Sequence, residues 1–428
     1  MSKKKKKSPW KVLLAILLGI VCGSLSGETA GLFGITFYSF YDTIGKLFIN
    51  ALMLIVVPLV AASIITGIAR IGNDSAFGRL GFKIFGFYIA TSFIAIVIGM
   101  FFVNVFNPGA FFASHGTAAI PATMVEQIKD NLAHGDQVSL VGILFQIIPS
   151  NILEVFNGQM LGLIFFSLLF GYAISKIDSQ PQSIIFNFWQ GIFQATLVIT
   201  DLVMHFLPIG VFCLVAKSFA TSGIASLHSL AIFFITVISG LAVFMLIALP
   251  LLLKFIAGVN PFLHIKAMAP ALITAFSTSS SSATLPVTIE CVEKRAGVSN
   301  RICSLVIPLG TSVNMSGSAL YECVAAVFIA QVYGIELSLA TQFSVLILAL
   351  VTSIGIAGIP SASIVAIIVI LKAIGLPPEG IGLLFAVDRI LDMCRTTVNV
   401  FSDSCCAVLV AKSEGEKDVL VNSSFDAI

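Results

Sequence analysis

The stretch AMAPALITAFSTSSSSATLPVTI, residues 267–289, decides the fold that the sequence predicts. Two apolar arms flank the polar run from Ser277 to Ser282, and each arm has about ten residues, half of a membrane crossing. A serine run alone is typical of a flexible linker, but here it has apolar arms on both sides. Non-helical backbone at membrane depth is tolerated only where it is buried in protein or lines a cavity. The stretch therefore predicts a broken segment inside a membrane protein.

A second broken stretch is expected at about 341–372, where the apolar pattern is cut by Gly355, Gly358 and Pro360. Each broken stretch is followed by a full helix, at about 302–332 and about 377–411. This repetition predicts an inverted repeat. In secondary transporters, broken helices of this kind mark the substrate site.

The composition is that of an all-α polytopic membrane protein. Hydrophobic residues make up 58% of the 428 residues, charged residues make up 10%, and the mean hydropathy is +1.05. A soluble globular protein usually carries about 25% charged residues, so this chain lacks the charge to coat a soluble surface. A disordered chain and a nucleic-acid-binding protein are excluded by the same numbers. Further apolar spans, each expected to cross the lipid bilayer, lie at about 10–25, 45–69, 84–106, 138–175, 185–216 and 229–257.

Basic residues predict the orientation. The run from Lys3 to Lys7 precedes the first span and no clear cleavage site follows, so we expect a retained helix with a cytoplasmic anchor. Lys83 and the cluster from Lys294 to Arg301 fall on the same side, and the polar stretch 107–137 falls on the other side. Both termini are therefore expected in the cytoplasm, with the protein in the cell (inner) membrane.

The last expected helix carries polar groups along one face. Asp388, Asp392, Arg395, Asn399 and Asp403 are separated by four, three, four and four residues, which places them within an arc of about 80°. Ionisable groups inside a membrane segment usually face a bundle interior or an aqueous cavity. Three aspartates and one arginine sum to −2, which predicts that bound cations balance this face. A structural cluster whose charges satisfy one another is the alternative.

A further helix is interrupted by Pro308, Gly310 and Asn314, which together predict local unwinding. Unwound carbonyls and the Asn314 side-chain oxygen are hard ligands that suit a small cation such as sodium. A plain kink without a ligand role is the alternative.

Four motifs, in this order, resemble those of the dicarboxylate/amino acid:cation symporter family. They are SSSSATLP at 279–286, NMSGSALY at 314–321, AGIP at 357–360 and DMCRTTVN at 392–399. With NALMLIVVPL at 50–59 and PIGVF at 208–212, the resemblance covers nearly the whole chain. It implies a homotrimer of protomers with eight transmembrane helices and two re-entrant helical hairpins, in which a transport domain moves like an elevator against a rigid scaffold.

The resemblance also implies domain boundaries. They are a basic cytoplasmic N-terminus at 1–9, scaffold helices 1 and 2 at 10–81, transport-domain helix 3 at 82–106, an extracellular loop at 107–137, scaffold helices 4 and 5 at 138–217, the rest of the transport domain (helix 6, hairpin 1, helix 7, hairpin 2 and helix 8) at 218–412, and a cytoplasmic tail at 413–428.

Roles carry over to the motif residues. Asp392 matches the position that binds the substrate amine, and Arg395 matches the one that grips the side-chain carboxylate. The other substrate positions are Ser279 and Ser281 at the first hairpin tip, Ile359 and Ser363 at the second, and Ser318, Thr396 and Asn399. The sodium positions are Gly310, Asn314, Asn399 and Asp403 at one site, Ser353, Ile354 and Ile356 at a second, and Tyr88, Thr91, Ser92 and Asn314 at a third.

The chain departs from the family at four positions. At one of them, Ser318 replaces a threonine and keeps a hydroxyl. Ser316 holds the position of a family aspartate that belongs to the third sodium site. A further pocket arginine of many members is also missing, because Ser279 and Met393 hold the two positions where it occurs.

The expected function is import of glutamate or aspartate coupled to sodium, without enzymatic activity. Proton coupling, a C4-dicarboxylate substrate and a neutral substrate such as serine or threonine stay open as alternatives. A C4-dicarboxylate would have no use for Asp392, and a neutral amino acid would leave Arg395 unpaired. An intramembrane serine hydrolase is disfavoured, because no histidine lies among the broken segments to act as a general base.

Overall fold

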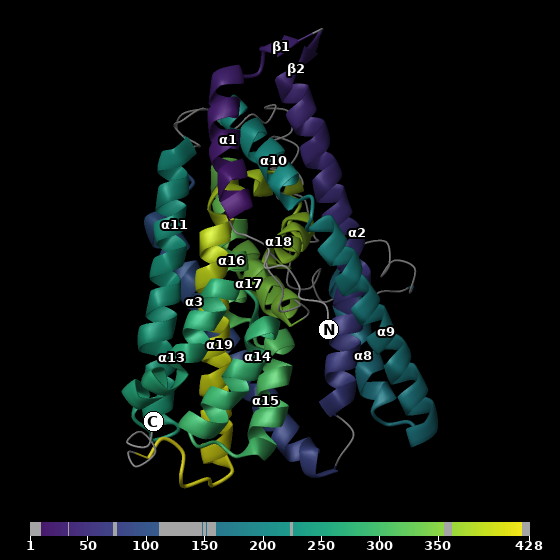
Figure 1. The fold of residues 1–428 in the computed structure, drawn as a ribbon, viewed down its shortest axis with the longest axis vertical. Helices are drawn as coiled ribbons and strands as arrows, with labels where there is room; N and C mark the ends of the chain where they lie inside the picture. Colours follow the sequence, from purple (N-terminus) through teal and green to yellow (C-terminus); the bar gives the residue numbers. More distant parts are fainter. Residues whose placement is uncertain are drawn as a thin grey trace.

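The computed structural model describes residues 10–32, 34–71, 75–110, 148, 151, 160–222, 226–354 and 362–421. These residues are mostly helical (Figure 1). A short antiparallel ribbon, β1 (Gly31–Leu32) and β2 (Ile35–Thr36), joins the first two helices, with Gly31 opposite Thr36. The first half of the chain contains α1 (Trp10–Ser26), α2 (Phe37–Ile71), α3 (Ser75–Phe106), α8 (Met160–Ile174), α9 (Ser179–Val203) and α10 (Leu207–Ser222).

The span expected at 185–216 is two helices rather than one. The helix α9 ends at Val203, and α10 begins at Leu207 after a turn. Pro208 lies in the first turn of α10, where its missing N–H costs no hydrogen bond. The expected domain boundaries at 81/82 and 217/218 fall inside α3 and α10. Arg79 and Lys83 interrupt the apolar run without interrupting the helix, because both residue types favour helix.

The second half contains more and shorter helices. They are α11 (Ser226–Val243), the π-helical η2 (Phe244–Ala248), α12 (Leu249–Phe255), α13 (Pro261–Thr278), α14 (Ser281–Glu290), the π-helical η3 (Cys291–Arg295), α15 (Asn300–Val313), α16 (Ser316–Val332), α17 (Leu339–Ser353), α18 (Ala362–Ala373), the 3-10 turn η4 (Pro378–Gly380) and α19 (Ile381–Ser413).

Two of the three expected breaks lie where the polar residues predict them. The helices α13 and α14 pack against each other across a turn in which Ser279 is left-handed, with φ 51°, and Ser280 caps α14. The expected helix at 302–332 is divided at Asn314 and Met315 into α15 and α16. The second broken stretch is flanked by α17 and α18, and its break, 355–361, lies outside the described residues.

The apolar helices are those of a multi-pass membrane protein. Five of them within the described ranges are long and apolar enough to span a membrane: Phe37–Ala69, Leu80–Phe106, Ser179–Val203, His228–Phe255 and Asn300–Val332. The helix α19 is also long, at 33 residues, but it carries the charged residues described above.

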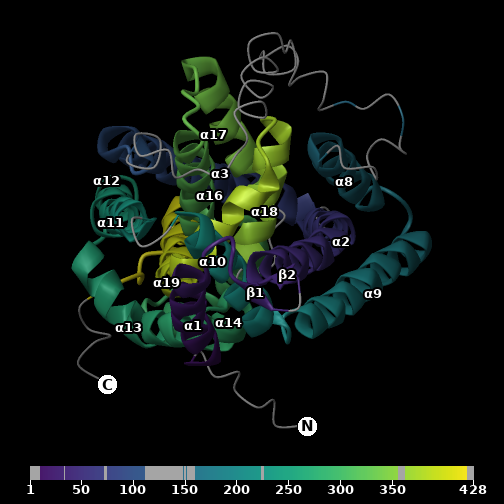
Figure 2. The same ribbon diagram turned by 90° about the horizontal axis from the view of Figure 1, so that it is seen from above.

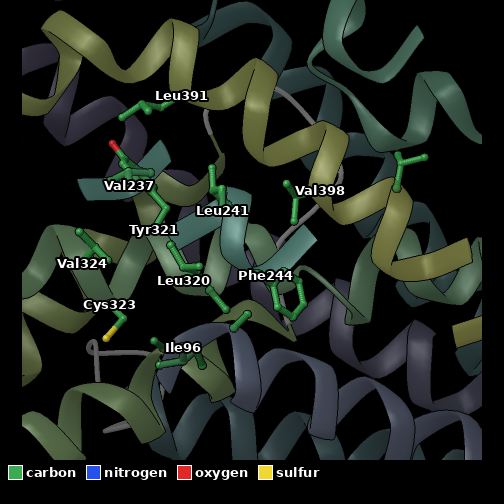
Figure 3. Close-up of a cluster of buried hydrophobic side chains, with 14 of the residues drawn as sticks. Ile96, Val237, Leu241, Phe244, Leu320, Tyr321, Cys323, Val324, Leu391 and Val398 are labelled. Carbon is green, nitrogen blue, oxygen red and sulfur yellow. The ribbon is translucent and has the colours of Figure 1, made fainter. Parts of the chain in front are cut away.

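The helices pack in one large core and one smaller cluster, and α2 contributes to both, through Phe48 and Ile49 in the core and Ile65 in the smaller cluster. The main core joins α3, α11, α13, α15, α16 and α19, and Figure 3 shows part of it around Leu320 and Tyr321 of α16. The rings of Phe233 and Phe328 stack in this core at 4.5 Å between centroids. A smaller cluster around Ile65, Leu163 and Ile174 joins α2, α8 and α9, which lie together on one side in both Figure 1 and Figure 2.

Candidate functional site

The helix α19 passes through the main core and buries its polar face there. Asp388, Asp392, Arg395, Asn399 and Asp403 are all buried, and α13, α14, α15 and α16 pack against this helix. The observed bounds, Ile381–Ser413, extend the expected helix by two residues at its C-terminal end and start it four residues later, after the turn η4. One continuous helix therefore positions five polar side chains at successive turns.

The first cluster of charges surrounds Arg395, and we call it the arginine cluster: Tyr321, Asp388, Arg389, Asp392 and Arg395. Arg395 Nη2 donates to Asp388 Oδ1 at 2.9 Å and to Asp392 Oδ1 at 3.0 Å. The Tyr321 ring lies 3.7 Å from Arg395 Cζ, and its hydroxyl donates to Asp388 Oδ1 at 3.1 Å. Nε and Nη1 of Arg395 are buried without a hydrogen-bond partner. A buried N–H donor without a partner costs about 1–3 kcal/mol. The cluster is therefore suited to bind a ligand that brings a hydrogen-bond acceptor.

Arg389 changes the charge balance expected for this face. Its Nη1 lies 3.6 Å from Asp392 Oδ2. With Arg389 included, three aspartates and two arginines sum to −1 rather than −2, and the arginine cluster itself sums to zero. The i, i+3 spacing from Arg389 to Asp392 was the signal in the sequence that points to this contact.

The second cluster surrounds the helix break at Asn314, and we call it the asparagine cluster: Thr91, Ser92, Asn314, Ser316, Ser402 and Asp403. Asn314 Nδ2 donates to Asp403 Oδ1 at 2.9 Å and to Ser402 Oγ at 3.2 Å. Asn314 Oδ1 accepts from Ser316 Oγ at 2.9 Å and from Thr91 Oγ1 at 3.1 Å. The break thus brings Asn314 together with side chains of α3, α16 and α19 at one buried place.

Gly310 and Tyr88 lie next to this cluster in different ways. A Cβ atom at Gly310 would overlap the Asp403 carboxylate, so this close approach requires glycine. The Tyr88 hydroxyl instead donates to the Val306 carbonyl at 2.5 Å, which ties α3 to α15. Of the residues expected at a third sodium site, Thr91, Ser92 and Asn314 are therefore hydrogen-bonded together, whereas the hydroxyl of Tyr88 bonds to backbone.

Asn399 connects the two clusters to the broken helix. Its Oδ1 accepts from the backbone N–H of Gly317 at 2.8 Å and of Ser318 at 3.3 Å, which satisfies donors in the first turn of α16. Its Nδ2 donates to Ser318 Oγ at 3.1 Å. Asn399 therefore fixes Ser318 relative to α19, and Thr396 lies buried one turn earlier.

The hairpin residues are described in part. Ser279 and Ser281 are buried at the α13–α14 turn, and Ser279 Oγ has no hydrogen-bond partner. Ser353, Ile354 and Ser363 are buried at the ends of α17 and α18. Ile356 and Ile359, which were expected to contribute to the second sodium site and the second hairpin tip, lie outside the described residues.

Sequence reasoning missed one buried acid. Glu322 in α16 is fully buried, its Oε2 accepts from Thr352 Oγ1 at 3.1 Å, and its Oε1 has no partner. This contact joins α16 to α17. A lone glutamate in an apolar helix is itself a signal of a functional position, and the sequence showed it.

Broken apolar helices around buried charge define a multi-pass membrane transporter. The family model described as the sodium:dicarboxylate symporter family matches residues 9–413. The chain belongs to this family, whose members are symporters and not enzymes.

Curated relatives are similar over nearly the whole chain. The proton/sodium-glutamate symport protein of Bacillus caldotenax is 36% identical over 414 residues, which cover 95% of this chain and 94% of the relative. The proton/glutamate-aspartate symporter of Escherichia coli is 33% identical, with 96% and 93% covered. Excitatory amino acid transporter 3 of Homo sapiens is 33% identical, with 95% and 86% covered.

Proposed function

We propose that this protein is a secondary active symporter that imports glutamate or aspartate together with sodium ions. Arg395 carries the proposal, because it is a fully buried guanidinium in a membrane protein, and two of its nitrogen atoms, Nε and Nη1, lack hydrogen-bond partners. A guanidinium matches a carboxylate in charge and in planar geometry. Asp392, bonded to the same arginine, offers a partner for the substrate ammonium.

The asparagine cluster supports sodium as the co-transported ion. Asp403, Asn314, Asn399 and the backbone near Gly310 provide the hard oxygen atoms that sodium prefers. Backbone at Ser353, Ile354 and Ile356 would provide a second site. Import of a substrate with net charge −1 against an inside-negative potential costs about 2.3 kcal/mol per 100 mV. One cation cancels that charge, and a second makes the cycle electrically favourable.

For the architecture, we propose a homotrimer in the cell (inner) membrane, with eight transmembrane helices, two re-entrant hairpins and both termini in the cytoplasm. The smaller cluster that joins α2, α8 and α9 supports a scaffold, which meets the main core through Phe48 and Ile49 of α2. The main core, which contains most of the buried residues of α3 and α11 to α19, supports one transport unit that moves like an elevator and carries both clusters.

A proton-coupled glutamate symporter is the second candidate, and Glu322 favours it. A buried carboxyl group with one unpartnered oxygen can carry a proton through the cycle. The Bacillus caldotenax relative is named for proton and sodium coupling, and the Escherichia coli relative is named for proton coupling. If protons drive uptake, Glu322→Gln should abolish uptake driven by a pH gradient, and Glu290→Gln, at an exposed position, should leave that uptake unchanged.

The substrate assignment is tested by competition. Purified protein in liposomes should take up labelled L-glutamate and L-aspartate. Either unlabelled acid should block this uptake, whereas succinate, serine and threonine should not. Block by succinate at the same concentration would favour a C4-dicarboxylate carrier, and block by serine or threonine would favour a neutral amino-acid carrier.

A further inference from the structure

The arginine cluster contains a second arginine of α19, Arg389. This residue lies outside the motifs that carry the family resemblance. Arg389 Nη1 lies 3.6 Å from Asp392 Oδ2, on the opposite carboxylate oxygen from Arg395. The Arg389 side chain is only 15% exposed, and its buried Nε has no hydrogen-bond partner. Burial of a guanidinium with an unused donor is costly, so this placement calls for a reason.

Satisfying Asp392 is not a sufficient reason. The distance of 3.6 Å is too long for a hydrogen bond, and Asp392 Oδ1 already accepts from Arg395. The two side chains are nevertheless close enough, and sufficiently buried, for their charges to interact. Arg389 therefore acts on the cluster through its charge rather than through a bond.

The charge matters because of what the cluster would bind. Asp388, Asp392 and Arg395 alone sum to −1, and Arg389 brings the sum to zero. Glutamate and aspartate carry a net charge of −1. Without Arg389 such a ligand would enter a buried site that is already negative, where low polarizability strengthens repulsion. A neutral amino acid gains nothing comparable from Arg389.

We propose that Arg389 is a specificity-determining residue that sets the preference for acidic over neutral amino acids by balancing the charge of the arginine cluster. The inference rests on the proposed function, in which this cluster binds glutamate or aspartate. Arg395 binds the ligand's side-chain carboxylate, and Arg389 compensates the aspartate pair.

The test compares L-aspartate with L-asparagine, which have nearly the same shape and differ by one charge. Dissociation constants are measured for full-length protein in sodium-containing buffer, with asparagine measured by competition against labelled aspartate. Arg389→Met should raise the aspartate constant at least ten-fold and change the asparagine constant less than three-fold. Arg389→Lys should keep both constants within three-fold of the native values. Arg301→Met, the same change at an exposed position, is the matched control and should alter neither.

The possible outcomes distinguish failure of the inference from failure of the proposed function. Equal shifts for both ligands, no shift, or an aspartate constant raised equally by Met and Lys would overturn the charge-balancing role. Native protein that binds neither aspartate nor glutamate would instead refute the proposed function, and the inference with it. Thermal unfolding verifies that each variant is folded, and Arg389→Gln replaces the Met variant in the same comparison if the latter does not fold.

Discussion

Arg395 is the residue on which substrate charge should depend. It is the fully buried cation of the arginine cluster, and its two unpartnered donors are the proposed carboxylate site. Arg395→Cys should lower uptake of glutamate and aspartate at least a hundred-fold, because a charge-assisted bidentate bond contributes about 3 kcal/mol. The same variant should admit neutral amino acids. Undiminished uptake of acidic substrates by Arg395→Cys would contradict the assignment.

Ser316 should set the number of coupled ions. Its hydroxyl lies 2.9 Å from Asn314 Oδ1, 3.1 Å from Ser402 Oγ and 3.2 Å from Ser92 Oγ, so the asparagine cluster has only dipoles at this position. A buried cation needs charged or numerous oxygen ligands. We therefore expect two sodium ions per substrate in the native protein, and three in Ser316→Asp.

Reversal potentials in proteoliposomes measure that ratio. Ser316→Asn is the matched control, because it adds a polar group of similar size without charge, and its ratio should stay at two. A native ratio of three that Ser316→Asp leaves unchanged would show that coupling does not depend on this position.

At the scale of elements, the second hairpin should be the external gate. In the sequence, this break contains Gly355, Gly358 and Pro360, followed by small residues, a composition that is typical of hinges. A cysteine at Ala362, the first residue of α18, should react with an external thiol reagent in ion-free protein. Sodium plus substrate should protect it. Equal labelling in both conditions would argue against gating by this hairpin. Labelling of the native protein, which has cysteines of its own, measures the background.

The segment after α19 should stabilise the fold, because it packs against the rest of the protein. Leu420 N–H donates to the Ala296 carbonyl at 2.9 Å, Glu416 Oε2 accepts from Ser299 N–H at 3.1 Å, and Val419 and Leu420 are buried. Removal of residues 414–428 should lower the free energy of unfolding by about 3 kcal/mol, since burial of one such apolar side chain contributes about 1.5–3 kcal/mol. Thermal unfolding measures the effect, and removal of 422–428 alone should have little. Equal midpoints for both truncations would contradict this role.

Element breaks could be predicted from the sequence where one residue type interrupts an apolar run. The serines at 279–280 and Asn314 are such cases, and both breaks lie where expected. The division between α9 and α10 was missed, although His205 lies in the turn and Pro208 marks the start of the next helix. The contact between Arg389 and Asp392 and the docking of Leu420 were also missed. The docking of Leu420 depends on how chain segments pack in three dimensions, which local patterns do not determine, whereas the contact of Arg389 had a local signal, its i, i+3 spacing from Asp392.

At the scale of the whole molecule, two buried clusters share one helix. The arginine cluster and the asparagine cluster both contain residues of α19, and Asn399 lies between them and bonds to the first turn of α16. Ligands at the two clusters would therefore bias the same pair of helices. A ligand that favours one arrangement of α16 and α19 raises the affinity for any ligand that needs the same arrangement. This would couple the binding of an acidic substrate to the binding of a cation.

The most direct measurement of this account is uptake of labelled L-glutamate and L-aspartate into proteoliposomes with imposed ion gradients. An inward sodium gradient at equal pH should drive accumulation, and an inside-negative potential should increase it. An inward proton gradient without sodium should drive none. Accumulation driven by protons alone, at the same rate with and without sodium, would contradict sodium-coupled import of acidic amino acids.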